Sequence, residues 1–163
     1  MATAPQTSPP PSPNEGLIKL IRGIALFKGF TPQEASVLLR VADRKQYESR
    51  QIIYEAGTPS TEMLILMSGK LVVVTEKGIR VANIQAGESV GEIGVMTDQP
   101  RSARVVSVEK SMGLVLQKKD LMNLLKAERD ICIKFQTNLI DMLADRLRKT
   151  DKLLDTYAKE KTE

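Results

Sequence analysis

Histidine is absent from this chain of 163 residues, and cysteine occurs once, at Cys132. Without histidine the chain lacks the commonest metal ligand and the commonest general base of proteins. One cysteine permits no internal disulfide and leaves nucleophilic dyads and structural zinc sites poorly supplied. We therefore predict that the chain is not an enzyme and holds no metal. A single free thiol also fits a reducing compartment, so we expect a cytoplasmic location.

Long apolar runs are missing as well. No stretch approaches the ~20 consecutive apolar residues of a membrane-spanning helix, and the N-terminus shows no secretory signal pattern. Basic residues outnumber acidic ones by 24 to 20, but between Asp141 and Glu163 six residues of each sign are interspersed. A mixed segment of this kind is typical of a solvated helix face and not of a basic nucleic-acid-binding stripe. We expect neither a membrane partner nor direct DNA binding.

The N-terminal segment differs in composition from the rest of the chain. Residues 1–14 carry five of the eight prolines and almost nothing that folding could bury, so we predict a disordered, Pro-rich tail. Residues 15–163 are predicted to form a single domain. At its start apolar residues repeat at helical spacing, and Thr31-Pro32-Gln33-Glu34 resembles a capping box with proline at the first helical position. We therefore expect residues 15–44 to be helical, with the second helix ending near Asp43.

From residue 45 to residue 117 the pattern changes to short β-rich runs. Glycines separate these runs at roughly the 8–12-residue spacing of a sandwich or barrel. The expected strands are residues 51–54, 63–67, 70–75, 79–84, 104–108 and 112–116. Helices are expected again over residues 118–158, the longer one from Asp130 to about Tyr157. The predicted fold class is mixed α+β: an antiparallel β-roll (a jelly-roll-like barrel) flanked by N-terminal helices and a long C-terminal helix.

The segment from Gly91 to Ala103 concentrates groups suited to an anionic ligand. Gly91 and Gly94 let the main chain approach a ligand closely, and a short helical turn after Gly91 would point its N–H groups at an anion. Arg101 offers a fork of donors to phosphate oxygens, and Glu92 can accept a hydrogen bond from a sugar hydroxyl. A glycine-containing turn followed by a surface arginine is the alternative interpretation.

Gly91-Glu92-Ile93-Gly94, followed by Arg101-Ser102-Ala103, resembles the phosphate-binding cassette of the cyclic-nucleotide-binding domain family. Bacterial catabolite activator protein, kinase regulatory subunits and nucleotide-gated channels share this domain, and the resemblance covers about residues 17–155. It implies that Arg101 pairs with the cyclic phosphate and Glu92 with the ribose 2′-hydroxyl. It also implies a cradle of main-chain donors from Gly91, Ile93, Ser102 and Ala103.

The same resemblance implies further contacts to the ligand. Matching the barrel strands places four apolar residues around the sugar and base, although plain core packing also accounts for them: Val73, Val81, Ala82 and Ile84. From the C-terminal helix it carries over Arg146 and Thr150 as contacts to the base or phosphate, with Leu153 as an apolar cap. Ordinary surface residues are the alternative for Arg146 and Thr150. In the family, a serine or threonine at the position of Ser102 occurs with either cAMP or cGMP as the ligand. We favour cAMP over cGMP.

The long C-terminal helix carries two apolar faces. One face follows a heptad seam with steps of three and four, which is the pattern of a coiled coil: Ile133, Gln136, Ile140, Leu143, Leu147, Thr150, Leu154 and Tyr157. The neighbouring face would pack against the domain itself: Ile131, Phe135, Leu139 and Met142. Two apolar faces on one helix predict one for the core and one for a partner. We expect a parallel homodimer through the seam.

These observations predict a stand-alone cyclic nucleotide receptor that signals to an unknown effector protein through its lid helix and dimer. Only 13 residues follow Thr150, too few for a helix-turn-helix module. The alternative is an interaction or dimerisation module of the same fold that has no ligand. Intact Glu92 and Arg101 argue against that alternative.

Overall fold

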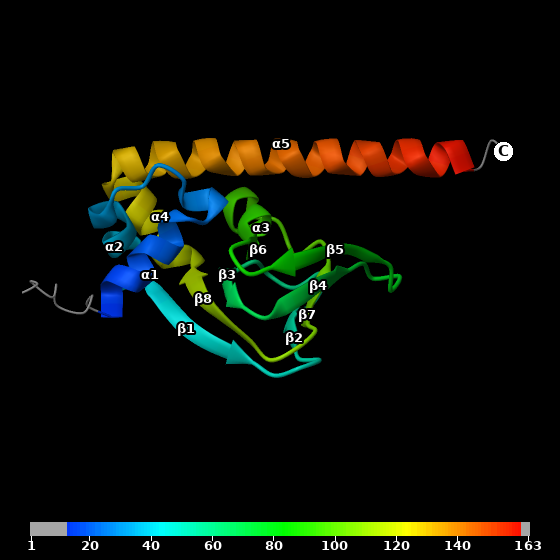
Figure 1. The fold of residues 1–163 in the computed structure, drawn as a ribbon, viewed down its shortest axis with the longest axis horizontal. Coiled ribbons are helices and arrows are strands. Elements are labelled where there is room, and N and C mark those ends of the chain that lie inside the picture. Colours follow the sequence, from blue (N-terminus) through cyan, green and yellow to red (C-terminus); the bar gives the residue numbers. More distant parts are fainter. Residues whose placement is uncertain (1–12, 161–163) are drawn as a thin grey trace, which may run out of the picture.

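The computed structural model describes residues 13–160. The helices are α1 (Pro13–Arg22), the 3-10 helix η1 (Ala25–Phe27), α2 (Pro32–Arg40), α3 (Glu92–Thr97), α4 (Lys118–Ala127) and α5 (Arg129–Glu160). Helices α1, α2 and α4 gather at one end of two β-sheets, and α5 runs along the whole length of the molecule (Figure 1). Residues 1–12 of the predicted tail lie outside the described part of the chain. Pro13 and Asn14 belong to α1, so the first helix begins two residues earlier than expected.

The strands pair only in antiparallel fashion and form two four-stranded sheets within the described residues. They are β1 (Ala42–Tyr47), β2 (Ile52–Tyr54), β3 (Glu62–Ser68), β4 (Lys70–Val74), β5 (Arg80–Gln85), β6 (Ser89–Val90), β7 (Arg104–Ser107) and β8 (Ser111–Gln117). The sheet orders are β1-β8-β3-β6 and β2-β7-β4-β5. This arrangement confirms the mixed α+β class and the β-roll, but the strands do not close into a barrel.

The predicted capping box starts α2. Thr31 Oγ1 accepts a hydrogen bond from the backbone N–H of Glu34, and the Glu34 carboxylate accepts one from the backbone N–H of Thr31. The end of this helix and two strands differ from expectation. The helix ends at Arg40 instead of near Asp43, because residues 42–47 form β1 along β8. Neither β1 nor the two-residue strand β6 was predicted.

Two apolar clusters hold the elements together. One lies between the helices and the sheet that contains β3 and β8, and it includes the aromatic rings of Phe27, Phe30 and Phe135. The other lies between the two sheets around Leu64 and Leu71. The predicted core face of α5 is confirmed, because Ile131, Phe135 and Leu139 are buried and Met142 packs against the first cluster. No helix in residues 13–160 is both long and apolar enough to span a bilayer.

Polar contacts fix the first half of α5 to the N-terminal helices. Lys134 Nζ lies 2.7 Å from a carboxylate oxygen of Glu34 at the start of α2. The side-chain amide of Asn138 donates to the carbonyl oxygens of Leu26 and Lys28, at 3.0 and 2.9 Å. The second half of α5 then runs past α3 and over the β-roll (Figure 1). The helix is therefore anchored at its N-terminal end, and its middle reaches β6 and α3 through Met142 and Arg146.

Candidate functional site

A cavity of about 730 Å³ lies between the β-roll, the segment from Gly91 to Ala103, and the second half of α5. This volume falls within the roughly 300–1,000 Å³ of small-ligand sites. Most of the site residues predicted from the sequence line the cavity: Val73, Val81, Ala82, Ile84, Gly91, Glu92, Ile93, Arg101, Ser102, Ala103, Arg146 and Thr150. The side chain of Leu153, the expected apolar cap, is not among those that the structure describes. Side chains from four separate stretches of the chain therefore meet around one space.

The loop that carries Arg101 is fixed against the segment from Gly57 to Ser60. The backbone N–H of Arg101 donates to the carbonyl of Thr58, and the N–H of Gly57 donates to the carbonyl of Arg101, both at 2.8 Å. The hydroxyl of Ser60 donates to the carbonyl of Gln99 at 2.7 Å. These bonds hold the loop in place before any ligand arrives.

Arg101 is a buried cation without a carboxylate partner. The residue is 7% exposed, and no acidic group in residues 13–160 lies within ion-pair distance of it. Nη1 donates to the carbonyl of Gly91 at 3.1 Å, and Nη2 donates to the carbonyl of Glu62. A buried charge is costly unless it is paired. An anion bound beside this guanidinium would therefore be stabilised by its positive charge.

Glu92 is the buried carboxylate of the site, with 1% of the residue exposed. Its Oε1 forms an ion pair with Nη1 of Arg146, whose Nη2 donates to the carbonyl of Ser89 at 2.9 Å. Its Oε2 has no hydrogen-bond partner among the described atoms. Arg146 lines the cavity as predicted, but here it contacts Glu92. The free oxygen leaves one buried acceptor for a donor from a ligand.

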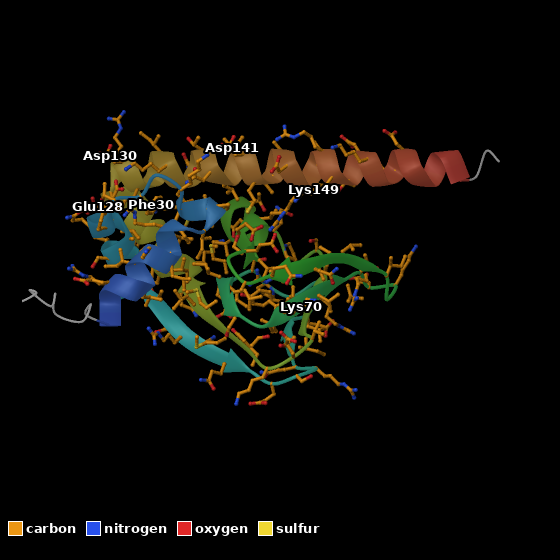
Figure 2. All side chains as sticks on the ribbon, viewed as in Figure 1. Phe30, Lys70, Glu128, Asp130, Asp141 and Lys149 are labelled. Atoms are coloured by element: carbon orange, nitrogen blue, oxygen red, sulfur yellow. The ribbon has the colours of Figure 1, made fainter. Side chains whose placement is uncertain are left out.

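The walls of the cavity combine apolar surface with a few polar groups. Val81 and Ile93 are about half exposed, at 52% and 46%, so they form the rim and not the deep wall. Several lining residues were not predicted from the sequence, including Tyr54, Asn83, Gln99 and Lys149. Figure 2 shows Lys149 on the side of α5 that faces the roll. Helical spacing from Arg146 was the signal that could have identified Lys149.

Two buried tyrosines, Tyr47 and Tyr54, belong to the apolar cluster between the sheets, and Tyr54 lies against Arg101. Burial raises the pKa of Tyr47 to about 12, with a further contribution from the negative charge of Glu62. Burial also raises the pKa of Tyr54 above its ordinary value. Both phenols are therefore neutral at neutral pH, and neither hydroxyl has a hydrogen-bond partner among the described atoms.

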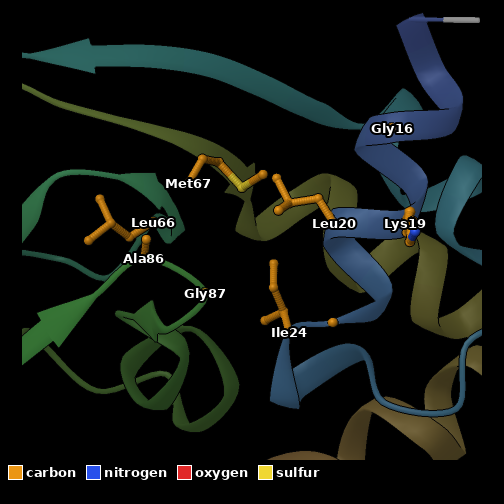
Figure 3. Close-up of a pocket in the computed structure, with 9 residues that line it drawn as sticks. Gly16, Lys19, Leu20, Ile24, Leu66, Met67, Ala86 and Gly87 are labelled. Carbon is orange, nitrogen blue, oxygen red and sulfur yellow. The ribbon is translucent and has the colours of Figure 1, made fainter.

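A second cavity, of about 440 Å³, lies between α1, the end of β3 and the turn that follows β5 (Figure 3). Leu20 contributes to it from α1, Ile24 from the residues between α1 and η1, and Leu66 and Met67 from β3. Lys19 is its one charged lining residue. With no convergent polar groups it lacks the donors and acceptors that orient a ligand, so the larger cavity is the candidate site.

Comparison with known proteins connects this geometry to a family. The model of the cyclic nucleotide-binding domain matches residues 44–128, more than half of the chain. The chain is 30% identical to the cyclic AMP receptor protein of Thermus thermophilus over 139 residues, which are 83% of this chain and 62% of that protein.

Solved structures show the same fold. The crystal structure of the Thermus thermophilus catabolite activator protein matches with a TM-score of 0.70 and 29% identity, covering 82% of this chain and 63% of that chain. A cyclic nucleotide-binding domain from Methylobacillus flagellatus matches with a TM-score of 0.77 and 24% identity, covering 88% and 83%. The chain thus spans less than two thirds of the length of the Thermus thermophilus relative, both in the sequence match and in the structural match. From the extent of the domain match, the chain belongs to the cyclic nucleotide-binding domain family.

Proposed function

We propose that this chain is a regulatory receptor for a cyclic mononucleotide, with cAMP preferred over cGMP. The observation that carries the proposal is Arg101, a buried guanidinium with no carboxylate partner in residues 13–160, on the wall of a nucleotide-sized cavity. A cyclic phosphate would supply the missing counter-charge and accept the donors that Arg101 keeps free. The preference for cAMP rests on the relative that is named a cyclic AMP receptor.

The ribose would be recognised by Glu92. Its Oε2 is buried and unpartnered while Oε1 is held by Arg146, so the free oxygen is oriented to accept a hydrogen bond from the 2′-hydroxyl. Main-chain N–H groups of Ile93, Ser102 and Ala103 are the proposed additional donors to the phosphate. A buried acceptor that loses its donor costs about 1–3 kcal/mol, so a 2′-deoxy ligand should bind more weakly.

The charges that line the cavity favour an anion with one negative charge. Three cationic residues line it, Arg101, Arg146 and Lys149, together with two carboxylates, Glu88 and Glu92. The sum is one positive charge, which matches the single charge of a cyclic mononucleotide. A cyclic dinucleotide would bring two negative charges and leave one of them uncompensated.

The signal would leave the site through α5. Arg146, Lys149 and Thr150 line the cavity from this helix, so a ligand that contacts them would shift the helix only as far as it binds one position better than another. We propose that an effector protein recognises the resulting change in α5 and in a dimer formed through its seam. No catalytic role and no DNA contact are part of the proposal.

Calorimetric titration of the whole chain with cAMP and cGMP tests the proposal. We expect micromolar binding, which corresponds to about 8 kcal/mol. Arg101→Ala should weaken it by about 2–5 kcal/mol because the phosphate would lose its buried partner. Arg104→Ala is the matched control, because the ion pair of Arg104 with Glu55 is exposed and Arg104 does not line the cavity. Absence of binding by the unmodified chain would favour the ligand-free dimerisation module instead.

A further inference from the structure

Tyr54 is a cavity residue to which the proposed function assigns no role. It ends β2 and lies opposite Val105 of β7. Its aromatic ring covers one face of the Arg101 guanidinium, with 3.7 Å between Cζ and the ring centroid. Only 6% of Tyr54 is exposed, so water does not screen the attraction between the cation and the ring.

We propose that Tyr54 is a positioning residue that presets the Arg101 guanidinium for the phosphate, an inference that rests on the proposed function. The guanidinium is fixed by three groups: the Tyr54 ring on one face, and the carbonyl oxygens of Glu62 and Gly91 at its two terminal nitrogens. An unrestrained arginine has many rotamers and loses that freedom when it binds a ligand. A guanidinium that is already in place avoids this loss.

The ring of Tyr54 carries this role, and its hydroxyl does not. The hydroxyl is buried and has no hydrogen-bond partner among the described atoms. Burial raises its pKa, so the ring that faces Arg101 belongs to a neutral phenol. Removing the hydroxyl therefore leaves the stacked pair intact. This makes Tyr54→Phe the matched control for changes that alter the ring itself.

The test varies the charge on the ring face while keeping its shape. Position 54 is occupied in turn by phenylalanine and by its 4-fluoro, 3,5-difluoro and 3,4,5-trifluoro analogues, and each protein is titrated calorimetrically with 3′,5′-cyclic AMP. Fluorine withdraws electron density from the ring face and so weakens its attraction for a cation. The apparent dissociation constant rises as the fraction of molecules with Arg101 in place falls.

We expect Tyr54→Phe to bind within about threefold of the unmodified chain. Across the fluorinated series the dissociation constant should rise stepwise, by about fivefold to tenfold in total. A purely structural role of the ring predicts no such trend, because the ring volume barely changes. Tyr54→Leu, with thermal unfolding to verify its fold, should lose at least as much affinity. The isosteric series still decides if that variant does not fold.

The outcomes separate the two proposals. Equal affinity for cAMP across the fluorinated series contradicts the positioning role of Tyr54 and leaves the receptor function intact. An unmodified chain that does not bind cAMP contradicts the receptor function and the role of Tyr54 together. A stepwise loss of affinity supports both.

Discussion

At Gly91 the backbone lies so close to the Arg101 side chain that a Cβ atom has no room. Its φ is +89°, and a Cβ atom at this position would lie 2.5 Å from Arg101 Nη1 and 3.1 Å from Cε2 of Tyr54. We predict that Gly91→Ala displaces the guanidinium and weakens cAMP binding by at least about tenfold, measured by calorimetry. The left-handed backbone should also lower the free energy of unfolding by about 1–2 kcal/mol.

Gly87→Ala separates the two effects of that change. Gly87 has nearly the same φ, +90°, but a Cβ atom there would meet no heavy atom within 4 Å. Both variants should therefore show the cost of a left-handed alanine in urea unfolding, to which Gly91→Ala adds the collision with Arg101, while Gly87→Ala keeps its affinity for cAMP. An equal loss of affinity in both proteins would show that backbone strain, and not displacement of Arg101, governs binding.

The sequence predicted which residues line the cavity better than it predicted their contacts. A short motif placed Glu92 and Arg101 on one loop, and the fold brings both to the cavity. It could not indicate that Glu92 pairs with Arg146, because these residues are 54 positions apart and meet only when α5 packs over the roll. Tyr54 was missed for the same reason, since its contact with Arg101 depends on the pairing of β2 with β7.

At the level of elements, the strands with apolar residues were predicted to within a few residues, and the polar ones were not. β1 has four consecutive exposed residues, 43–46, and pairs only with β8 at the sheet edge. Charged residues are common on such edges because they discourage pairing with other chains. They also remove the apolar alternation by which a strand is recognised. β6 has only two residues, too few for any pattern.

Arg146 is the contact through which α5 reaches the carboxylate of the binding loop. Removing it would leave Glu92 buried without its cationic partner, although the 36% exposure of the Arg146 side chain moderates the cost. We predict that Arg146→Ala lowers the free energy of unfolding by about 2 kcal/mol, below the 3–5 kcal/mol of a fully buried pair. Urea unfolding followed by circular dichroism measures the change.

Arg148→Ala provides the control on the same helix. Its ion pair with Asp145 is exposed on both sides, at 66% and 65%, and exposed pairs contribute little to stability because water and salt screen them. A second control repeats Arg146→Ala in a Glu92→Gln background, where no buried charge is left and the loss should shrink below about 1 kcal/mol. If Arg146→Ala costs no more than Arg148→Ala, the ion pair does not tether α5 to the loop.

For the whole molecule, the ligand cavity and the free apolar face meet on one helix. Lys149 and Thr150 line the cavity, whereas four side chains spaced seven residues apart are more than half exposed in the described chain: Ile133 (52%), Ile140 (66%), Leu147 (63%) and Leu154 (61%). Leu153 and Tyr157 were predicted as an apolar cap and a seam residue; both belong to α5, but their side chains are not among those that the structure describes. A contiguous stripe of exposed apolar side chains marks an interaction surface. The heptad spacing of this stripe suits a second copy of the same helix.

We predict that the 18.0 kDa chain sediments as a dimer and that Leu147→Glu converts it to a monomer, because two carboxylates would face each other across the seam. Arg148→Glu is the control: it lies about 100° further round the helix and should leave the dimer intact. Sedimentation equilibrium measures both. Repeating it with cAMP tests whether ligand and partner are coupled, since a ligand that alters dimer affinity must bind monomer and dimer differently. A monomeric unmodified chain, or a dimeric Leu147→Glu variant, would contradict the seam as the dimer interface.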